Sequence, residues 1–118
     1  PYVRAAGAEA AASGLPLMRA LFLHHPDDRL CWTIQDQYLY GRDLLVAPVV
    51  TEGAAARPVY LPDDDWRCLY DGTPHAAGWH ERAAPNGLPP VFVRAAAPMR
   101  EALLALGAAH AAAARGLA

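Results

Sequence analysis

Residues 34–49 read Ile-Gln-Asp-Gln-Tyr-Leu-Tyr-Gly-Arg-Asp-Leu-Leu-Val-Ala-Pro-Val, and this stretch decides the fold. The part before Gly41 has the pattern of the last turns of a helix, and Gly41 is a typical helix stop. Residues 44–50 then form a continuous apolar run that predicts a buried strand. We therefore predict α/β structure before this stretch, and short strands joined by tight turns after it.

The chain before residue 34 predicts a helix, a strand and a second helix. Residues 2–13 are alanine-rich with apolar positions at helical spacing, and Gly14 suits a left-handed cap at their end. The short apolar run 15–23 predicts a strand buried on both faces, as in parallel α/β sheets. Asp27 or Asp28 is expected to cap a second helix that ends at Gly41.

The chain after residue 50 has turn signals about every ten residues, which is typical of an antiparallel sandwich or barrel. The strands expected from residue 44 onward are 44–50, 58–62, 66–70, 78–84 and 91–95, with turns at 63–65, 71–72 and 86–87. Pro98 fits the first position of a closing helix over about 98–114.

The composition excludes several classes of protein. The 118 residues carry a net charge of −2 without a basic stripe, so we expect neither a nucleic acid partner nor binding to an anionic membrane. No apolar run is long enough to span a bilayer. We expect a soluble, cytoplasmic protein. Cys31 and Cys68 lie in apolar segments and are expected to be buried free thiols, with a disulfide as the alternative.

The start of the chain indicates a piece of a longer protein. The first residues, 1–13, are already helix-like, and they include no initiator methionine or leader. The 54 % hydrophobic content is nevertheless enough for a core.

Candidate site residues have to be weighed singly, because the sequence has no phosphate loop, Cys-x-x-Cys pair, His-Glu-x-x-His or Gly-x-Ser-x-Gly motif. His24 and His25 follow the first expected strand, at the end where α/β proteins keep their sites. They are candidates for lining a substrate site, and the alternative is a loop or capping role. No catalytic residue and no metal ligand is predicted.

The other polar and aromatic groups favour structural roles. Asp63–Asp65 read as a turn and not as a carboxylate cluster. Asp36 and Arg42 are expected to pair or to bind loop backbone. His75, His80 and His110 are scattered and receive no role. Trp66, Tyr70 and Trp79 fit core packing, with a sugar-stacking platform as the alternative.

Residues 36–49 also resemble the motif that joins the catalytic barrel to the proximal C-terminal β-domain in glycoside hydrolase family 31. Residues 14–28 resemble the segment of the eighth barrel strand, where most members have Pro at the place of Ala20. The downstream matches to the β-domain are 57–62, Trp66, 70–72, 84–85 and 90–95. Within this family, residues 22–25 and 34–41, and the short helix directly after 91–95, are similar to the sulfoquinovosidases.

The resemblance implies a fold and an activity. Residues 1–42 would be the last strand-helix unit of a (β/α)8 barrel, 43–96 an antiparallel β-sandwich-like domain, and 97–118 a closing helix. Family members are retaining α-glycosidases, which need two carboxylates about 5 Å apart. In the family both are aspartates on earlier barrel strands, and no segment here matches either motif.

The expected function is therefore that of a C-terminal fragment that closes the barrel and braces it, without the catalytic carboxylates. A carbohydrate would bind through the upstream barrel, and no cofactor is implied. The alternative is a stand-alone carbohydrate-binding or structural β-module.

Overall fold

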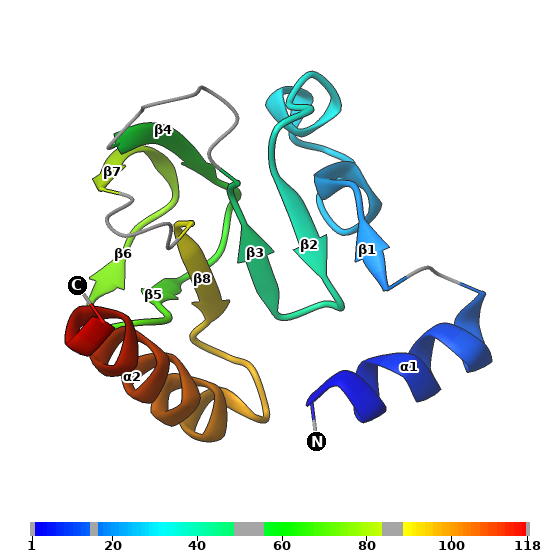
Figure 1. Cartoon of the computed structure of the whole chain (residues 1–118). Coiled ribbons are helices and arrows are strands. Elements are labelled where there is room, and N and C mark those ends of the chain that lie inside the picture. Colours follow the sequence, from blue (N-terminus) through cyan, green and yellow to red (C-terminus); the bar gives the residue numbers. More distant parts are fainter. Residues whose placement is uncertain (1, 15–16, 49–55, 84–88, 118) are drawn as a thin grey trace.

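The computed structural model describes residues 2–14, 17–48, 56–83 and 89–117. The turn expected at 86–87 lies outside these residues. The elements, labelled as in Figure 1, are α1 (Tyr2–Ser13), β1 (Met18–Arg19), the 3-10 turns η1 (Leu21–Leu23) and η2 (Arg29–Trp32), β2 (Tyr38–Tyr40), β3 (Leu44–Val46), β4 (Ala56–Leu61), β5 (Trp66–Cys68), β6 (Pro74–His75), β7 (Gly78–Ala83), β8 (Val91–Arg94) and α2 (Arg100–Leu117).

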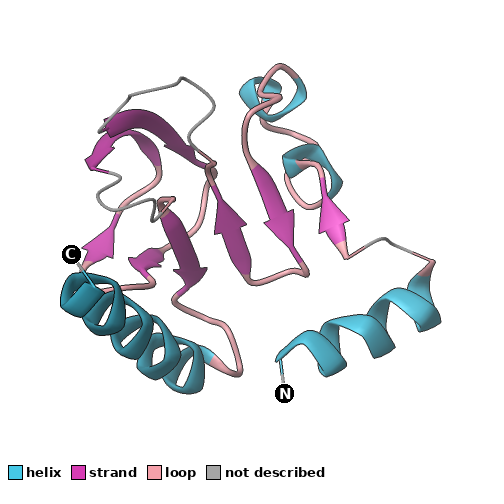
Figure 2. Ribbon diagram, in the orientation of Figure 1, coloured by secondary structure: helices cyan, strands magenta, loops and turns pink. Residues whose placement is uncertain are grey.

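The strands form a larger sheet and a ribbon (Figure 2). Among the described residues the larger sheet has six strands in the order β1-β2-β3-β8-β5-β6, while β4 and β7 pair separately as a two-stranded ribbon. Every strand pair in this part of the chain is antiparallel. Within the described residues β1 pairs antiparallel with β2 and not in a parallel α/β sheet, so the barrel unit expected for residues 1–42 stays a prediction, whereas the expected antiparallel β-domain is confirmed.

The larger sheet is covered on both faces. Leu45, Phe92 and Cys68 stand side by side across β3, β8 and β5, and they belong to one buried cluster together with Val59 and Leu61 of β4. The opposite face carries Val93, which packs with Leu103 of α2. The alternation of side chains along each strand thus separates one core under the ribbon from another under α2.

The first third of the chain contains the main corrections. The predicted strand 15–23 is, in its described part, the two-residue β1 followed by η1, where the N–H of Leu23 bonds to the carbonyl of Ala20 and closes the backbone locally. The predicted helix up to Gly41 is only η2 followed by β2. Leu39 of β2 lies opposite Leu45, and both are fully buried, so cross-strand packing overrides the helix-like spacing.

Several predicted features are confirmed. Helix α1 spans Tyr2–Ser13, and Gly14 follows with a φ of +79° and donates to the Ala10 carbonyl, as in an αL cap. Strands β3, β4, β5, β7 and β8 fall within or next to the expected ranges, whereas β6 was not predicted. Cys31 and Cys68 are buried free thiols.

The β2–β3 hairpin needs a glycine for two reasons. Gly41 has a φ of +67°, and a Cβ there would lie 2.3 Å from the Tyr2 hydroxyl oxygen. That hydroxyl donates to the Tyr40 carbonyl at 2.6 Å and accepts from the Asp43 N–H at 3.1 Å. Gly41 is thus the point where α1 is fastened to the hairpin, and not the end of a helix. The hairpin also crosses the predicted domain boundary at residues 42 and 43, which itself stays a prediction.

Candidate functional site

Two hollows meet at His24 and His25, which directly follow η1. The first has a volume of about 480 Å³ and opens between this loop and β4. The second, of about 370 Å³, extends toward β8. Asp63 lines both, the first also includes Asp27, Asp28, Arg29 and Tyr60, and the second also includes Arg42, Asp64 and Arg94. The structure therefore places both predicted histidines on the walls of a hollow, and their role in binding stays a prediction.

Asp28 closes the histidine loop onto the ribbon. One of its oxygens accepts from the Leu30 N–H at 3.0 Å and caps η2, as predicted for Asp27 or Asp28. The other accepts from the Tyr60 hydroxyl. Burial, and then the bond to the Asp28 carboxylate, raise the pKa of Tyr60 to about 12. Both oxygens of Asp28 are engaged in holding the wall of the first hollow together.

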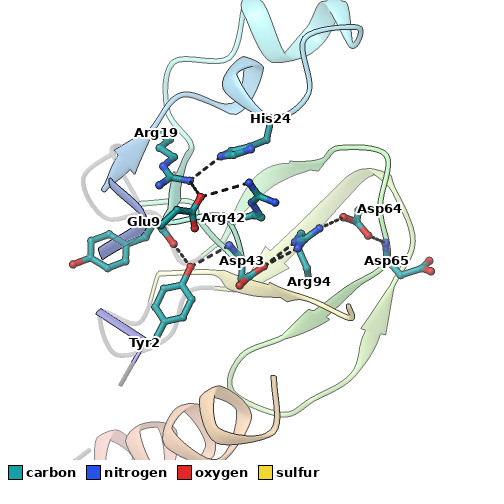
Figure 3. A network of polar contacts seen from close by, with 10 residues as sticks. Tyr2, Glu9, Arg19, His24, Arg42, Asp43, Asp64, Asp65 and Arg94 are labelled. Atoms are coloured by element: carbon teal, nitrogen blue, oxygen red, sulfur yellow. Dashed lines mark hydrogen bonds and ion pairs between the residues drawn. The ribbon is translucent and has the colours of Figure 1, made fainter. Parts of the chain in front are cut away.

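Arg94 forms the far wall of the second hollow (Figure 3). Its guanidinium contacts the Asp43 carboxylate at 2.8 and 3.0 Å and that of Asp64 at 3.4 Å. The second oxygen of Asp64 accepts from the Asp65 N–H at 2.8 Å. The acidic run 63–65 thus lies in a bend just before β5, and the contact of Asp64 with Arg94 ties this bend to β8. This agrees with the prediction that the three aspartates form a turn and not a carboxylate cluster.

Gln37 and Arg57 join the ribbon to the larger sheet. The Gln37 amide accepts from the Tyr60 N–H at 2.8 Å and donates to the Tyr60 carbonyl at 2.7 Å, as a neighbouring strand would. Arg57 is 8 % exposed, donates to the backbone carbonyls of Asp36 and Pro48, and pairs with the Asp36 carboxylate at 3.3 Å. The side chains of Gln37 and Arg57 thus make the hydrogen bonds that backbone pairing would otherwise make between β4 and the loop before β2.

A second group of charges ties α1 to β1 and to the first histidine (Figure 3). The buried Arg19 guanidinium lies 3.2 Å from the Glu9 carboxylate and 2.9 Å from Nε2 of His24. Arg42 contacts the same Glu9 oxygen at 3.5 Å. Asp36 and Arg42, which were expected to pair or to bind backbone, do form ion pairs, but with partners that the sequence did not indicate.

Sequence reasoning missed Glu9, Arg19, Arg57 and Arg94 as members of these networks. The one usable signal was Arg19, a lone charge inside the apolar run 17–23, since an arginine buried in such a run needs an acidic partner. The identity of that partner depends on the packing of α1 and could not be read locally.

The aromatic platform is not assembled. Trp66 is 1 % exposed, and its indole N–H donates to the Pro62 carbonyl at 3.0 Å. Tyr70 is partly buried and donates to the Pro89 carbonyl at 2.7 Å. Trp79 alone of the three is exposed, tilted against Tyr60 with ring centroids 5.2 Å apart. Core packing, the favoured interpretation, therefore holds for Trp66.

The chemistry available in the hollows is that of ion pairs and hydrogen bonds. The Asp28 carboxylate accepts from the Tyr60 hydroxyl, and the Asp64 carboxylate pairs with Arg94, so both have partners within the fold. In the part of the chain that the structure describes, no three His, Cys, Asp or Glu side chains are grouped to hold a metal ion.

Neither α1 nor α2, within the described ranges, combines the length and apolar character that crossing a bilayer requires.

Comparison with known proteins assigns the family. The model for "Glycosyl hydrolase family 31 C-terminal domain" matches residues 14–97. A sulfoquinovosidase from Escherichia coli is 50 % identical over 95 residues, which is 80 % of this chain, and one from Agrobacterium fabrum is 45 % identical over 97 residues. The chain spans about 14 % and 15 % of the length of these two relatives.

A solved structure agrees with the sequence relatives. The sulfoquinovosidase of family 31 from E. rectale, in complex with an aza-sugar inhibitor, superposes with a TM-score of 0.86 and 34 % identity. The match covers 93 % of this chain and 16 % of that one. The resemblance seen in residues 14–28 and 36–49 is thereby confirmed. The chain belongs to glycosyl hydrolase family 31.

Proposed function

We propose that this chain is the C-terminal part of a retaining α-glycosidase of family 31 that acts on α-sulfoquinovosides. The observation that carries the proposal is the 50 % identity to the Escherichia coli sulfoquinovosidase across 80 % of the chain. The relative from Agrobacterium fabrum is also a sulfoquinovosidase and supports the same substrate class.

In this proposal the chain supplies structure and not the reacting groups. A retaining glycosidase needs a carboxylate nucleophile and a carboxylic acid on either side of the scissile bond. Of the carboxylates in this region, Asp28 is bound by Tyr60, and Asp43 and Asp64 are paired with Arg94, which fits structural roles for these three. The two catalytic aspartates would therefore come from chain upstream of residue 1, and the carbohydrate would bind there.

The proposed division assigns 1–42 to the end of the barrel, 43–96 to the β-domain and 97–118 to the closing helix. The β2–β3 hairpin runs across the first of these boundaries, with Leu39 facing Leu45. Bracing would therefore pass through a continuous sheet and not through a flexible linker. The cytoplasmic location belongs to the same proposal.

The experiment compares two proteins, the isolated 118 residues and the product of the complete reading frame that encodes them. We expect the longer protein to hydrolyse an aryl α-sulfoquinovoside and the isolated chain to be inactive on it and on the matching α-glucoside. Activity of the isolated chain that disappears when one of its own aspartates is replaced would refute the structural role. A longer protein without any α-glycosidase activity would refute the assignment as a whole.

A further inference from the structure

The contact between Arg19 and His24 restricts the protonation of the histidine. Nη1 of Arg19 lies 2.9 Å from Nε2 of His24, and the arginine side chain has no exposed surface. A guanidinium only donates hydrogen bonds and keeps its charge at any ordinary pH. Nε2 of His24 must therefore accept, so the ring is neutral and carries its proton on Nδ1.

The surroundings of His24 disfavour a second positive charge. Four charged or titratable groups surround His24. They are Glu9 of α1, Arg19 of β1, Arg42 of the β2–β3 turn, and His25, the next residue in the loop that carries His24. The adjoining hollow adds Asp63, Asp64 and Arg94. Nearest to His24, one carboxylate is thus shared by two guanidinium groups, and Asp64 is already paired with Arg94.

We propose that His24 is a pH-dependent latch, which in its neutral form holds the Arg19–Glu9 pair and with it the C-terminal half of α1 against the sheet. Protonation turns Nε2 into a donor that faces a buried donor, so the hydrogen bond to Arg19 is lost and like charges meet. His24 then leaves Arg19, and the guanidinium that pairs with Glu9 loses the neighbour that fixed its position, which weakens the Arg19–Glu9 contact. The N-terminal end of α1 stays fastened, because Tyr2 is bound to the Tyr40 carbonyl independently of this contact.

The direction of the effect follows from the pKa. Burial lowers the pKa of His24 below its usual value, and the positive charges of Arg19 and Arg42 lower it further. The unfolded chain therefore binds a proton more readily than the folded one in the window below pH about 6.5. The contribution of the latch to stability is complete above that window and is lost as the pH falls through the folded-state pKa.

The test uses amide hydrogen exchange of the 118-residue chain at about pH 7.5 and about pH 5, corrected for the intrinsic exchange rate. The key variant is H24Q, whose side-chain carbonyl can accept from Arg19 but cannot titrate. The matched control is H25Q, because His25 is the adjacent histidine and burial also lowers its pKa. The amides of α2 serve as the internal reference.

We expect acidification to lower the exchange protection of the amides of residues 9–14 severalfold more in the wild type and in H25Q than in H24Q. The exchange protection of the α2 amides should change equally in all three proteins. Equal loss in the wild type and H24Q would overturn the proposal. If H24Q does not fold, an NMR titration of the wild-type His24 ring decides. A proton on Nδ1 at neutral pH and a pKa below the ordinary value support the latch, and a proton on Nε2 or an ordinary pKa overturns it.

Discussion

Replacement of Gly41 by alanine tests how α1 is fastened to the β2–β3 hairpin. The alanine Cβ would lie 2.3 Å from the hydroxyl oxygen of Tyr2 and 3.2 Å from the Cβ of Ala6. Because the Tyr2 hydroxyl is the movable end of a side chain, the clash is relieved by displacing it. The displacement breaks its hydrogen bonds to the Tyr40 carbonyl and the Asp43 N–H.

The expected magnitude has two parts. Holding a residue with a Cβ at the φ of +67° seen for Gly41 costs about 1–2 kcal/mol. Each lost hydrogen bond of Tyr2 removes about 0.5–1.5 kcal/mol. We therefore expect Gly41→Ala to lower the free energy of unfolding by about 2–5 kcal/mol. The matched control is Gly14→Ala, since Gly14 has a φ of +79° and open space around it, and should show the backbone part alone.

Urea unfolding of the 118-residue chain, followed by tryptophan fluorescence and far-UV circular dichroism, measures these changes. A double-mutant cycle with Tyr2→Phe isolates the contact, because the phenylalanine has already lost both hydrogen bonds. We expect Gly41→Ala to cost about 1–3 kcal/mol less in the Tyr2→Phe background. Equal costs for the Gly41 and Gly14 variants, together with no coupling in the cycle, would refute the reasoning.

Further predictions concern glycines in α2 and α1, the contact between the ribbon and the larger sheet, and ligand binding. Gly107→Ala should destabilise the protein by about 3 kcal/mol or more, because the new Cβ would lie 2.1 Å from the Leu69 carbonyl oxygen. Gly7→Ala should stabilise it by about 0.5–1 kcal/mol, because a Cβ there meets nothing within 4 Å. Similar free energies of unfolding for the two variants in urea would contradict this prediction. Gln37→Leu should cost about 2–4 kcal/mol, because the Tyr60 N–H and carbonyl both lose their partner, and a cost under about 0.5 kcal/mol would show that the amide does not join the ribbon to the sheet. Titration of the isolated chain with millimolar glucose should leave its tryptophan fluorescence unchanged, and a saturable change would revive the stand-alone carbohydrate-binding module.

The parts of the fold that the sequence predicts well are those with local causes. Gly14 ends α1 because its left-handed conformation satisfies the last helix carbonyls nearby. The strands after residue 56 are bounded by turn residues such as the Asp71–Gly72 pair, and Gly72 indeed has a positive φ of +73°. These signals act within a few residues and need no knowledge of the tertiary structure.

The failures come from contacts that are distant in the sequence. Tyr38, Leu39 and Tyr40 have helix-compatible spacing with the residues before them, yet they pair with β3, where Leu39 is buried opposite Leu45. The family resemblance led in the same direction as the local pattern, since it suggested an α/β unit for this part of the chain. Only the strand partner on the far side of Gly41 decides between the two structures.

The site was predictable to a similar extent. His24 and His25 were singled out from their position after an apolar run, and both line a hollow. Arg19, which contacts His24, and Glu9, which pairs with Arg19, were not found, because Glu9 approaches Arg19 only when α1 folds back along β1. Sequence spacing carries no information on such a docking angle.

The most direct test of the proposed function is the ratio of kcat/KM for an aryl α-sulfoquinovoside to that for the α-glucoside with the same leaving group. It is measured on the purified product of the complete reading frame that contains this chain, with the anomer of the first product followed by NMR. The proposal predicts a ratio well above one and an α-configured first product, as retention of configuration requires. A ratio below one would contradict the assigned substrate class, and a β-configured first product would contradict the retaining mechanism.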